Sequence, residues 1–284
     1  MVPGSVPRAE ERMSAPEPRI YAYGIVRLRD GDDLAAPVPV RGLHGGAVRA
    51  LACGRLAALV SDLPPQASAP LDDVWRDPDR IKSLVLEHHR VLRGVVLERT
   101  VLPLRFGAVF SDDDGVATAL AMHCDALWEA LDRVDGAREW GVKIFCDQDV
   151  LHSHLSQDTD GVGAGPAQIN APSAGRAFFM RRQMEHRAAQ DVRDSIIRRI
   201  VESGRLLSAA ARTAAALRIQ PPAIHGRADE MVCNSAFLVA REQENRFLAV
   251  IDGLRDVSPR SGFDYELNGP WAPCSFTHFS LGSA

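Results

Sequence analysis

Lysine is nearly absent from this chain: only Lys82 and Lys143 accompany the arginines. The 33 basic residues are balanced by 37 acidic ones, so the sequence lacks the positive field that nucleic-acid binding needs. No run approaches the roughly 18 apolar residues of a membrane-spanning helix, and the first residues carry charges where a signal peptide would be apolar. We therefore expect an intracellular protein that binds neither nucleic acid nor a membrane.

Cysteine is also scarce. The five cysteines are odd in number, widely spaced and without a CxxC pair, which argues against a zinc site or a redox motif. We expect reduced thiols, as in a cytosolic protein. These residues are Cys53, Cys124, Cys146, Cys233 and Cys274.

Motifs for nucleotide binding and nucleophilic catalysis are missing too. There is no GxGxxG, no Gly-Lys-Ser/Thr and no GxSxG. The glycine-rich stretch at 161–165 lies in a segment typical of a flexible spacer. Acidic runs such as 112–114 suit the start of a helix, where they interact favourably with its dipole. The sequence therefore predicts no cofactor and no catalytic residues.

Two adjacent histidines keep an enzymatic alternative open. Neighbouring residues on a helix point about 100° apart, so His88 and His89 do not easily share one metal ion. His88 also falls on the apolar stripe of a predicted helix, which favours a hydrogen-bonded core histidine. His152 and His154, in the predicted linker, are weaker candidates. The alternative is a metal-dependent or small-molecule enzyme centred on His88 and His89 with nearby carboxylates.

The pattern in the first half of the chain predicts one α+β domain. Residues 1–18 are too poor in apolar side chains to pack and are predicted to be a disordered tail. Residues 19–149 form the N-terminal α+β domain, whose first helix has a clear start because Asp77 can cap and Pro78 fits the first turn. The predicted strands are 20–26, 47–52, 55–61, 101–106 and 138–145, and the predicted helices are 78–99 and 112–135.

The second half begins after a polar stretch. Residues 150–175 lack periodicity and are predicted to be a flexible linker. Residues 176–284 form a second α+β domain, which opens with a long helix to about residue 202 and continues with strands at 231–240 and 262–269. This order predicts a modified ferredoxin-like domain. The apolar stripe of the long helix repeats every four residues and so rotates, which indicates contact with more than one neighbour.

One charged residue interrupts an apolar run: Arg105, in TVLPLRFGAVF at 100–110. On an extended strand Arg105 faces away from Leu102 and Leu104, so it leaves the core. We expect its guanidinium to pair with an acid or a partner rather than to serve catalysis.

Seven motifs follow one another along nearly the whole chain: YAYGIV at 21–26, HHRVL at 88–92, TVLPLRFGAVF, EWGVKIF at 139–145, AGRAFFMRR at 174–182, NSAFLVAR at 234–241 and NGPWAPCSF at 268–276. In kind and order they resemble the GvpL/GvpF family of gas vesicle proteins. One segment departs from the family pattern, because Ala272 and Cys274 stand where the closing motif of the family usually has a second Pro-Pro pair and a tyrosine.

The resemblance implies a two-domain, non-enzymatic protein of gas vesicle formation, located at the vesicle within the cytoplasm. It also implies binding to the small shell protein GvpA and to other accessory Gvp proteins. Candidate contact residues are Arg181, Arg182 and Arg187 on the long helix, and Trp271 and Phe276 near the end of the chain. For the helix, the simpler interpretation is an ordinary solvated face, and for the two aromatic residues it is closure of their own core. A general scaffold unrelated to vesicles is a further alternative.

Overall fold

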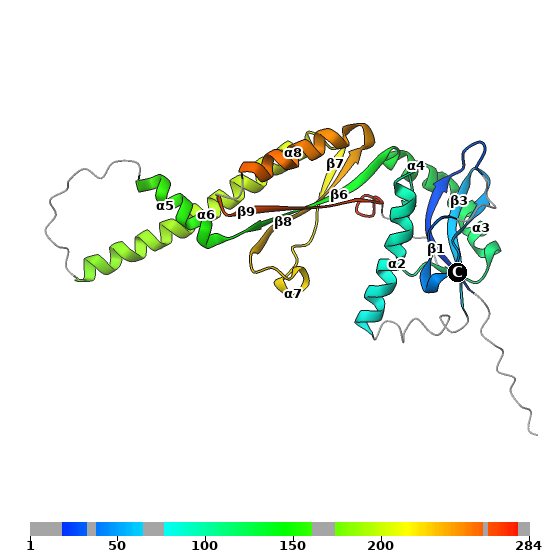
Figure 1. The fold of residues 1–284 in the computed structure, drawn as a ribbon, viewed down its shortest axis with the longest axis horizontal. Coiled ribbons are helices and arrows are strands. Elements are labelled where there is room, and N and C mark those ends of the chain that lie inside the picture. The colour runs from blue at the N-terminus through cyan, green and yellow to red at the C-terminus, as the bar shows by residue number, and fades with distance from the viewer. Residues whose placement is uncertain (1–18, 33–37, 65–76, 161–173, 258–260, 278–284) are drawn as a thin grey trace, which may run out of the picture. The chain divides into compact units, whose positions relative to one another are not determined.

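The computed structural model describes residues 19–32, 38–64, 77–160, 174–257 and 261–277 (Figure 1). The chain divides into two compact units, and the division falls between Arg133 and Val134. The predicted tail at 1–18 lies outside the described residues. None of the helices in the described part of the chain combines the length and hydropathy of a membrane-spanning segment.

The first unit contains an antiparallel sheet of five strands. They are β1 (Arg19–Arg27), β2 (Arg49–Cys53), β3 (Leu56–Leu63), β4 (Leu102–Pro103) and β5 (Val109–Phe110). The order is β2-β3-β1-β4, and β5 also pairs with β1. As predicted, β2 and β3 form a hairpin around Gly54, whose φ of 60° suits glycine.

Helices pack on both faces of this sheet. They are α2 (Pro78–Val96), α3 (Asp113–Met122) and α4 (Cys124–Val134). One face packs against α3 and α4 around residues such as Ile25, Val60 and Leu131, and the other face packs against α2. The predicted start of α2 is confirmed, since the Asp77 carboxylate accepts the N–H groups of Asp79 and Arg80. The single helix predicted at 112–135 is wrong, because α3 ends before His123 and α4 begins after it.

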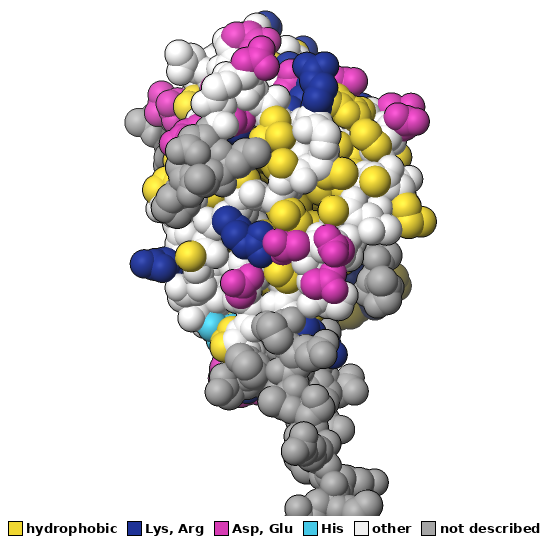
Figure 2. Space-filling model, turned by 90° about the vertical axis from the view of Figure 1, so that its right-hand side faces the viewer, with side chains coloured by type: hydrophobic (Ala, Val, Ile, Leu, Met, Phe, Trp, Pro, Cys, Tyr) yellow, Lys and Arg dark blue, Asp and Glu magenta, His cyan; other side chains and the backbone are white. Residues whose placement is uncertain are grey.

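The run around Arg105 is less regular than a full strand. Only Leu102 and Pro103 join the sheet, where they pair with β1. Leu102 and Leu104 are buried and Arg105 is exposed. The prediction that the arginine leaves the core is therefore confirmed. Figure 2 shows one face of the molecule, on which hydrophobic side chains lie among acidic and basic ones.

The second unit contains an antiparallel sheet of four strands in the order β7-β8-β6-β9. They are β6 (Ala137–Cys146), β7 (Thr213–Ala216), β8 (Glu230–Ala240) and β9 (Phe263–Trp271). The prediction that the strand at 138–145 belongs to the first domain is wrong. The strand is the central β6 of the second sheet, since it pairs along its length with β8 and β9.

The helices of this unit are α5 (Gln148–Asp160), α6 (Ala174–Ser208), α7 (Pro222–His225) and α8 (Glu244–Val257). Buried side chains of α6 and α8 pack against one face of the sheet, with Phe247 and Ile251 fully buried beside Trp140. The predicted linker at 150–175 is wrong over 150–160, where α5 runs, and at 174–175, where α6 begins, and its remaining part at 161–173 lies outside the described residues. Leu151 of α5 is buried in the same core, which stabilises this helix despite its polar sequence.

Candidate docking site

The buried histidine of the first unit is a core residue. His88 Nδ1 lies 2.9 Å from the Tyr21 hydroxyl, which also accepts the Gly107 N–H at 3.1 Å. The ring stacks on Tyr23, with centroids 5.7 Å apart and an interplanar angle of 29°. Burial lowers the pKa of His88 to about 4, so the imidazole is neutral at pH 7 and its Nδ1 accepts the hydrogen bond that the Tyr21 hydroxyl donates. The prediction of a hydrogen-bonded core histidine is confirmed.

The positions of His88 and His89 do not favour the metal-dependent enzyme that the sequence left open. The rings of His88 and His89 are nearly perpendicular, at 87°, with centroids 5.5 Å apart. Nowhere in the described ranges do three or more His, Cys, Asp or Glu side chains gather closely enough to hold a metal ion. His88 is held instead between two tyrosines and Phe106, a neighbourhood that favours packing over coordination.

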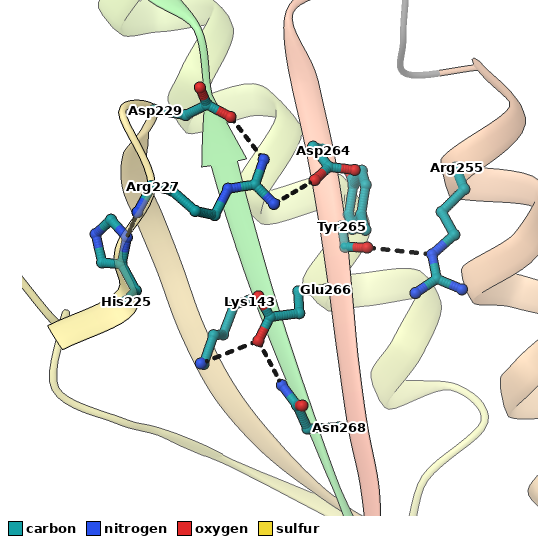
Figure 3. A network of polar contacts seen from close by, with 9 residues as sticks. All are labelled: Lys143, His225, Arg227, Asp229, Arg255, Asp264, Tyr265, Glu266 and Asn268. Atoms are coloured by element: carbon teal, nitrogen blue, oxygen red, sulfur yellow. Dashed lines mark hydrogen bonds and ion pairs between the residues drawn. The ribbon is translucent and has the colours of Figure 1, made fainter. Parts of the chain in front are cut away.

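A polar network lies on β9 and its neighbours in the second unit (Figure 3). Asp264, Glu266 and Asn268 alternate along β9 and so share one face of the sheet. Arg227 pairs with Asp229 at 2.6 Å and with Asp264 at 2.7 Å, and its guanidinium lies 4.2 Å from the centre of the Phe145 ring. These contacts fix the segment after α7 onto the sheet.

The second part of the network joins β9 to β6. Glu266 Oε1 accepts hydrogen bonds from Asn268 Nδ2 at 2.8 Å and from Lys143 Nζ at 3.1 Å. The bond from Asn268, followed by the contacts of Lys143, lowers the pKa of Glu266. A carboxylate held ionised in this way serves as an acceptor and brace and not as a general acid near pH 7.

The long helix α6 has two halves with different surroundings. From Val192 to Leu207 it contributes buried side chains to the core of the second unit. Between residues 175 and 187 every side chain that the structure describes is exposed. This exposed half carries large apolar side chains that a core would normally cover: Phe178 is 60% exposed, Phe179 73%, Met180 49% and Met184 68%. Such a patch on a helix is typical of a protein-protein contact.

The three predicted contact arginines lie on this exposed half but not on one face. Each residue of a helix turns by about 100°, so Arg181 and Arg182 point about 100° apart. Arg187 lies more than about 100° from both of them. The helix therefore presents Arg181 and Arg182 beside Phe178, and presents Arg187 on the opposite side with Met180 and Met184.

The two predicted aromatic contact residues lie elsewhere in the second unit. Trp271 ends β9 and is half-buried, and Phe276 packs against Val134, Ala137 and Leu238. Their segment is tied to the beginning of β6 by Glu139, whose carboxylate accepts the backbone N–H and the hydroxyl of Ser275, both at 2.7 Å. Burial raises the pKa of Glu139.

A groove next to α6 is a feature that the sequence did not reveal. It has a volume of about 830 Å³ and is lined by α5, α6 and the beginning of β8. Val192, Ile196 and Met231 provide apolar lining, and Glu185 and Glu230 add carboxylates. The groove lies near the end of β6, whereas Trp271 and Phe276 lie near its beginning, so β6 separates the two candidate regions. The four-residue spacing of the apolar stripe was the available signal, but only the fold shows which part stays open.

Comparison with known proteins gives one consistent result. The family profile of the gas vesicle synthesis protein GvpL/GvpF matches residues 19–278. Gas vesicle protein L of a Streptomyces species is 30% identical over 262 residues, covering 90% of this chain and 91% of that protein. Gas vesicle protein F of the same strain is 29% identical over 259 residues, covering 90% of this chain and 98% of that protein. In fold, the chain is similar to the crystal structure of GvpF from an Anabaena species, with a TM-score of 0.65 and 20% identity over 93% of this chain and 98% of that one.

Proposed function

The chain belongs to the GvpL/GvpF family of gas vesicle synthesis proteins, and we propose that it is a non-enzymatic accessory or minor structural protein of gas vesicle assembly. In this role it binds the small shell protein GvpA and other accessory Gvp proteins, at the gas vesicle within the cytoplasm. The observation that carries the proposal is the family match over residues 19–278, which spans both units of the fold.

The physical demands of a gas-filled shell support this role. Subunits that line a gas space must present apolar surface, so before assembly they expose apolar side chains and strand edges that promote aggregation. A protein that binds these subunits shifts the equilibrium towards the soluble, assembly-competent form by mass action. The exposed half of α6 offers phenylalanine and methionine side chains for such a contact, and methionine adapts well to irregular apolar partners.

We propose that the contacts use α6 and the C-terminal segment. On α6 the contact residues are Arg181, Arg182 and Arg187, whose guanidinium groups can bind carboxylates of a partner. Near the end of the chain they are Trp271 and Phe276. The exposure of the arginines supports the first region more strongly, because Phe276 already packs within its own unit.

A pull-down of each purified Gvp protein with the full chain tests this function. We expect GvpA to be retained by the wild type and to be retained less by Met184→Glu combined with Arg187→Glu. The matched control is Arg246→Glu, an exposed charge reversal on α8 that should leave retention unchanged. The proposal would be wrong if the wild type retained no Gvp protein and a strain lacking the gene formed normal vesicles.

We also propose that the second unit is a modified ferredoxin-like domain. The strand order β7-β8-β6-β9 with α6 and α8 packed on one face supports it.

A further inference from the structure

One face of α6 runs without interruption from the exposed half into the groove. Phe178, Arg182, Glu185, Ala189 and Val192 follow one another at intervals of four and three residues, so they lie along the same side of the helix. Glu185, Ala189 and Val192 line the groove, whereas Phe178 and Arg182 extend beyond it. The face is therefore aromatic and basic at its beginning, and acidic, small and apolar further along.

The groove offers space, apolar side chains and carboxylates, which the aromatic and basic beginning of this face does not. Ala188 and Ala189 leave space beside the helix, and Ile196 and Met231 provide apolar contact. Asp149 on α5 and Glu230 on β8 add two carboxylates to that of Glu185, and these three outnumber the one guanidinium that lines the groove, that of Arg193. An aromatic side chain followed by an arginine is the chemistry that this groove complements, and the chain itself carries that pair at the beginning of the same face.

We propose that a second copy of this chain occupies the groove, with its α6 antiparallel to the first. When Arg182 faces Glu185 of the second copy, an antiparallel arrangement also places Phe178 opposite Ala189 of that copy. The two-fold symmetry then repeats both contacts with the copies exchanged. In a parallel arrangement in register, each Arg182 would lie beside the Arg182 of the other chain. Repulsion between these like charges favours the antiparallel arrangement. This inference rests on α6 and the groove and does not depend on a role in gas vesicles.

The size of the contact predicts a weak dimer. A buried phenylalanine contributes about 150–250 Å², so the two copies of Phe178 supply roughly a quarter of the 1,200–2,000 Å² of a stable interface. Groove walls and the stems of the arginines supply the remainder. The Arg182–Glu185 pairs lie at the surface, where their attraction adds modestly to the affinity and also fixes the orientation, whereas reversing one charge turns both attractions into repulsions. We expect a dissociation constant on the order of 10 μM, which weakens as the salt concentration rises.

Sedimentation of the full chain from about 1 to about 300 μM measures this equilibrium. Arg182→Glu and Glu185→Arg each place like charges opposite one another twice in the homodimer. We expect each variant to dissociate about 30-fold more readily than the wild type. Phe178→Ala should also weaken the dimer, because it removes the aromatic side chain that fills the groove.

A mixture of the two charge variants provides the sharpest test. One variant then carries carboxylates at both positions and the other carries guanidinium groups at both, so the antiparallel arrangement places opposite charges face to face twice. A heterodimer should therefore form where each variant alone is monomeric. Arg187→Glu, on the other side of the helix, is the matched control and should dimerise as the wild type does. A wild type that stays monomeric at the highest concentration, or a mixture that forms no heterodimer, would overturn the proposal.

Discussion

The stability of the first unit should depend on pH through His88. The side chain is 2% exposed, and burial lowers its pKa from 6.5 to about 4. In the unfolded chain the same imidazole binds a proton below about pH 6.5. The folded state therefore carries the fewer protons between these values, and the contribution of His88 is fully present above pH 6.5 and is lost as the pH falls towards 4.

The magnitude follows from the difference between the two pKa values. A change from 6.5 to about 4 corresponds to about 3 kcal/mol of unfolding free energy. His88→Gln removes the titration. We expect this variant to be less stable than the wild type by about 1–3 kcal/mol near pH 7.5, because it loses ring contacts with Tyr21 and Tyr23. Near pH 4.5 the difference should have fallen by about 2–3 kcal/mol, since only the wild type takes up a proton on unfolding.

Urea unfolding over this pH range measures the effect, with amide hydrogen exchange in β1 as a readout confined to the first unit. Tyr21→Phe is the companion variant. It removes the hydroxyl bonded to Nδ1 but keeps the histidine, so its stability should fall with pH much as that of the wild type does. NMR titration of His88 gives the pKa directly. A value between about 6 and 7, or a constant stability difference between His88→Gln and the wild type, would refute the reasoning.

Three further substitutions test other parts of the fold. Asp77→Ala removes the cap that accepts two backbone N–H groups and should cost about 1 kcal/mol of unfolding free energy in urea, whereas Asp79→Ala should cost less. Phe247→Ala empties a fully buried site and should cost about 3–5 kcal/mol in thermal or urea unfolding; a loss below about 1 kcal/mol would contradict this packing. Arg227→Ala should cost about 1–2 kcal/mol in low salt and less in about 1 M NaCl, and equal losses in both would exclude the ion pairs as the cause.

Local signals in the sequence predicted the features that depend on a few neighbouring residues. The cap at Asp77, the turn at Gly54, the outward direction of Arg105 and the burial of His88 each follow from spacing or conformational preference within about ten residues. The arginines predicted as contact residues are exposed in the structure. Whether they bind a partner stays a prediction.

Features set by distant contacts were not predicted. The alternation in β6 is the same whichever sheet it joins, and its partner β8 follows about 90 residues later in the chain. The polar sequence of α5 did not indicate a helix, because this helix depends on the burial of Leu151 in the core of the second unit. The groove beside α6 requires α5 and β8 to be in place, so no pattern within one element could have revealed it.

The length of α6 explains why this unit has an exposed helix at all. Its 35 residues span about 52 Å, whereas the 11 residues of β8 span about 37 Å. The helix is therefore about 15 Å, or roughly ten residues, longer than this strand, and every described side chain over 175–187 is exposed. An exposed helical segment is normally polar, yet this one carries Phe178, Phe179, Met180 and Met184. Exposed apolar side chains of this size reduce solubility unless something covers them, and this is the physical reason for the contacts that we propose on α6.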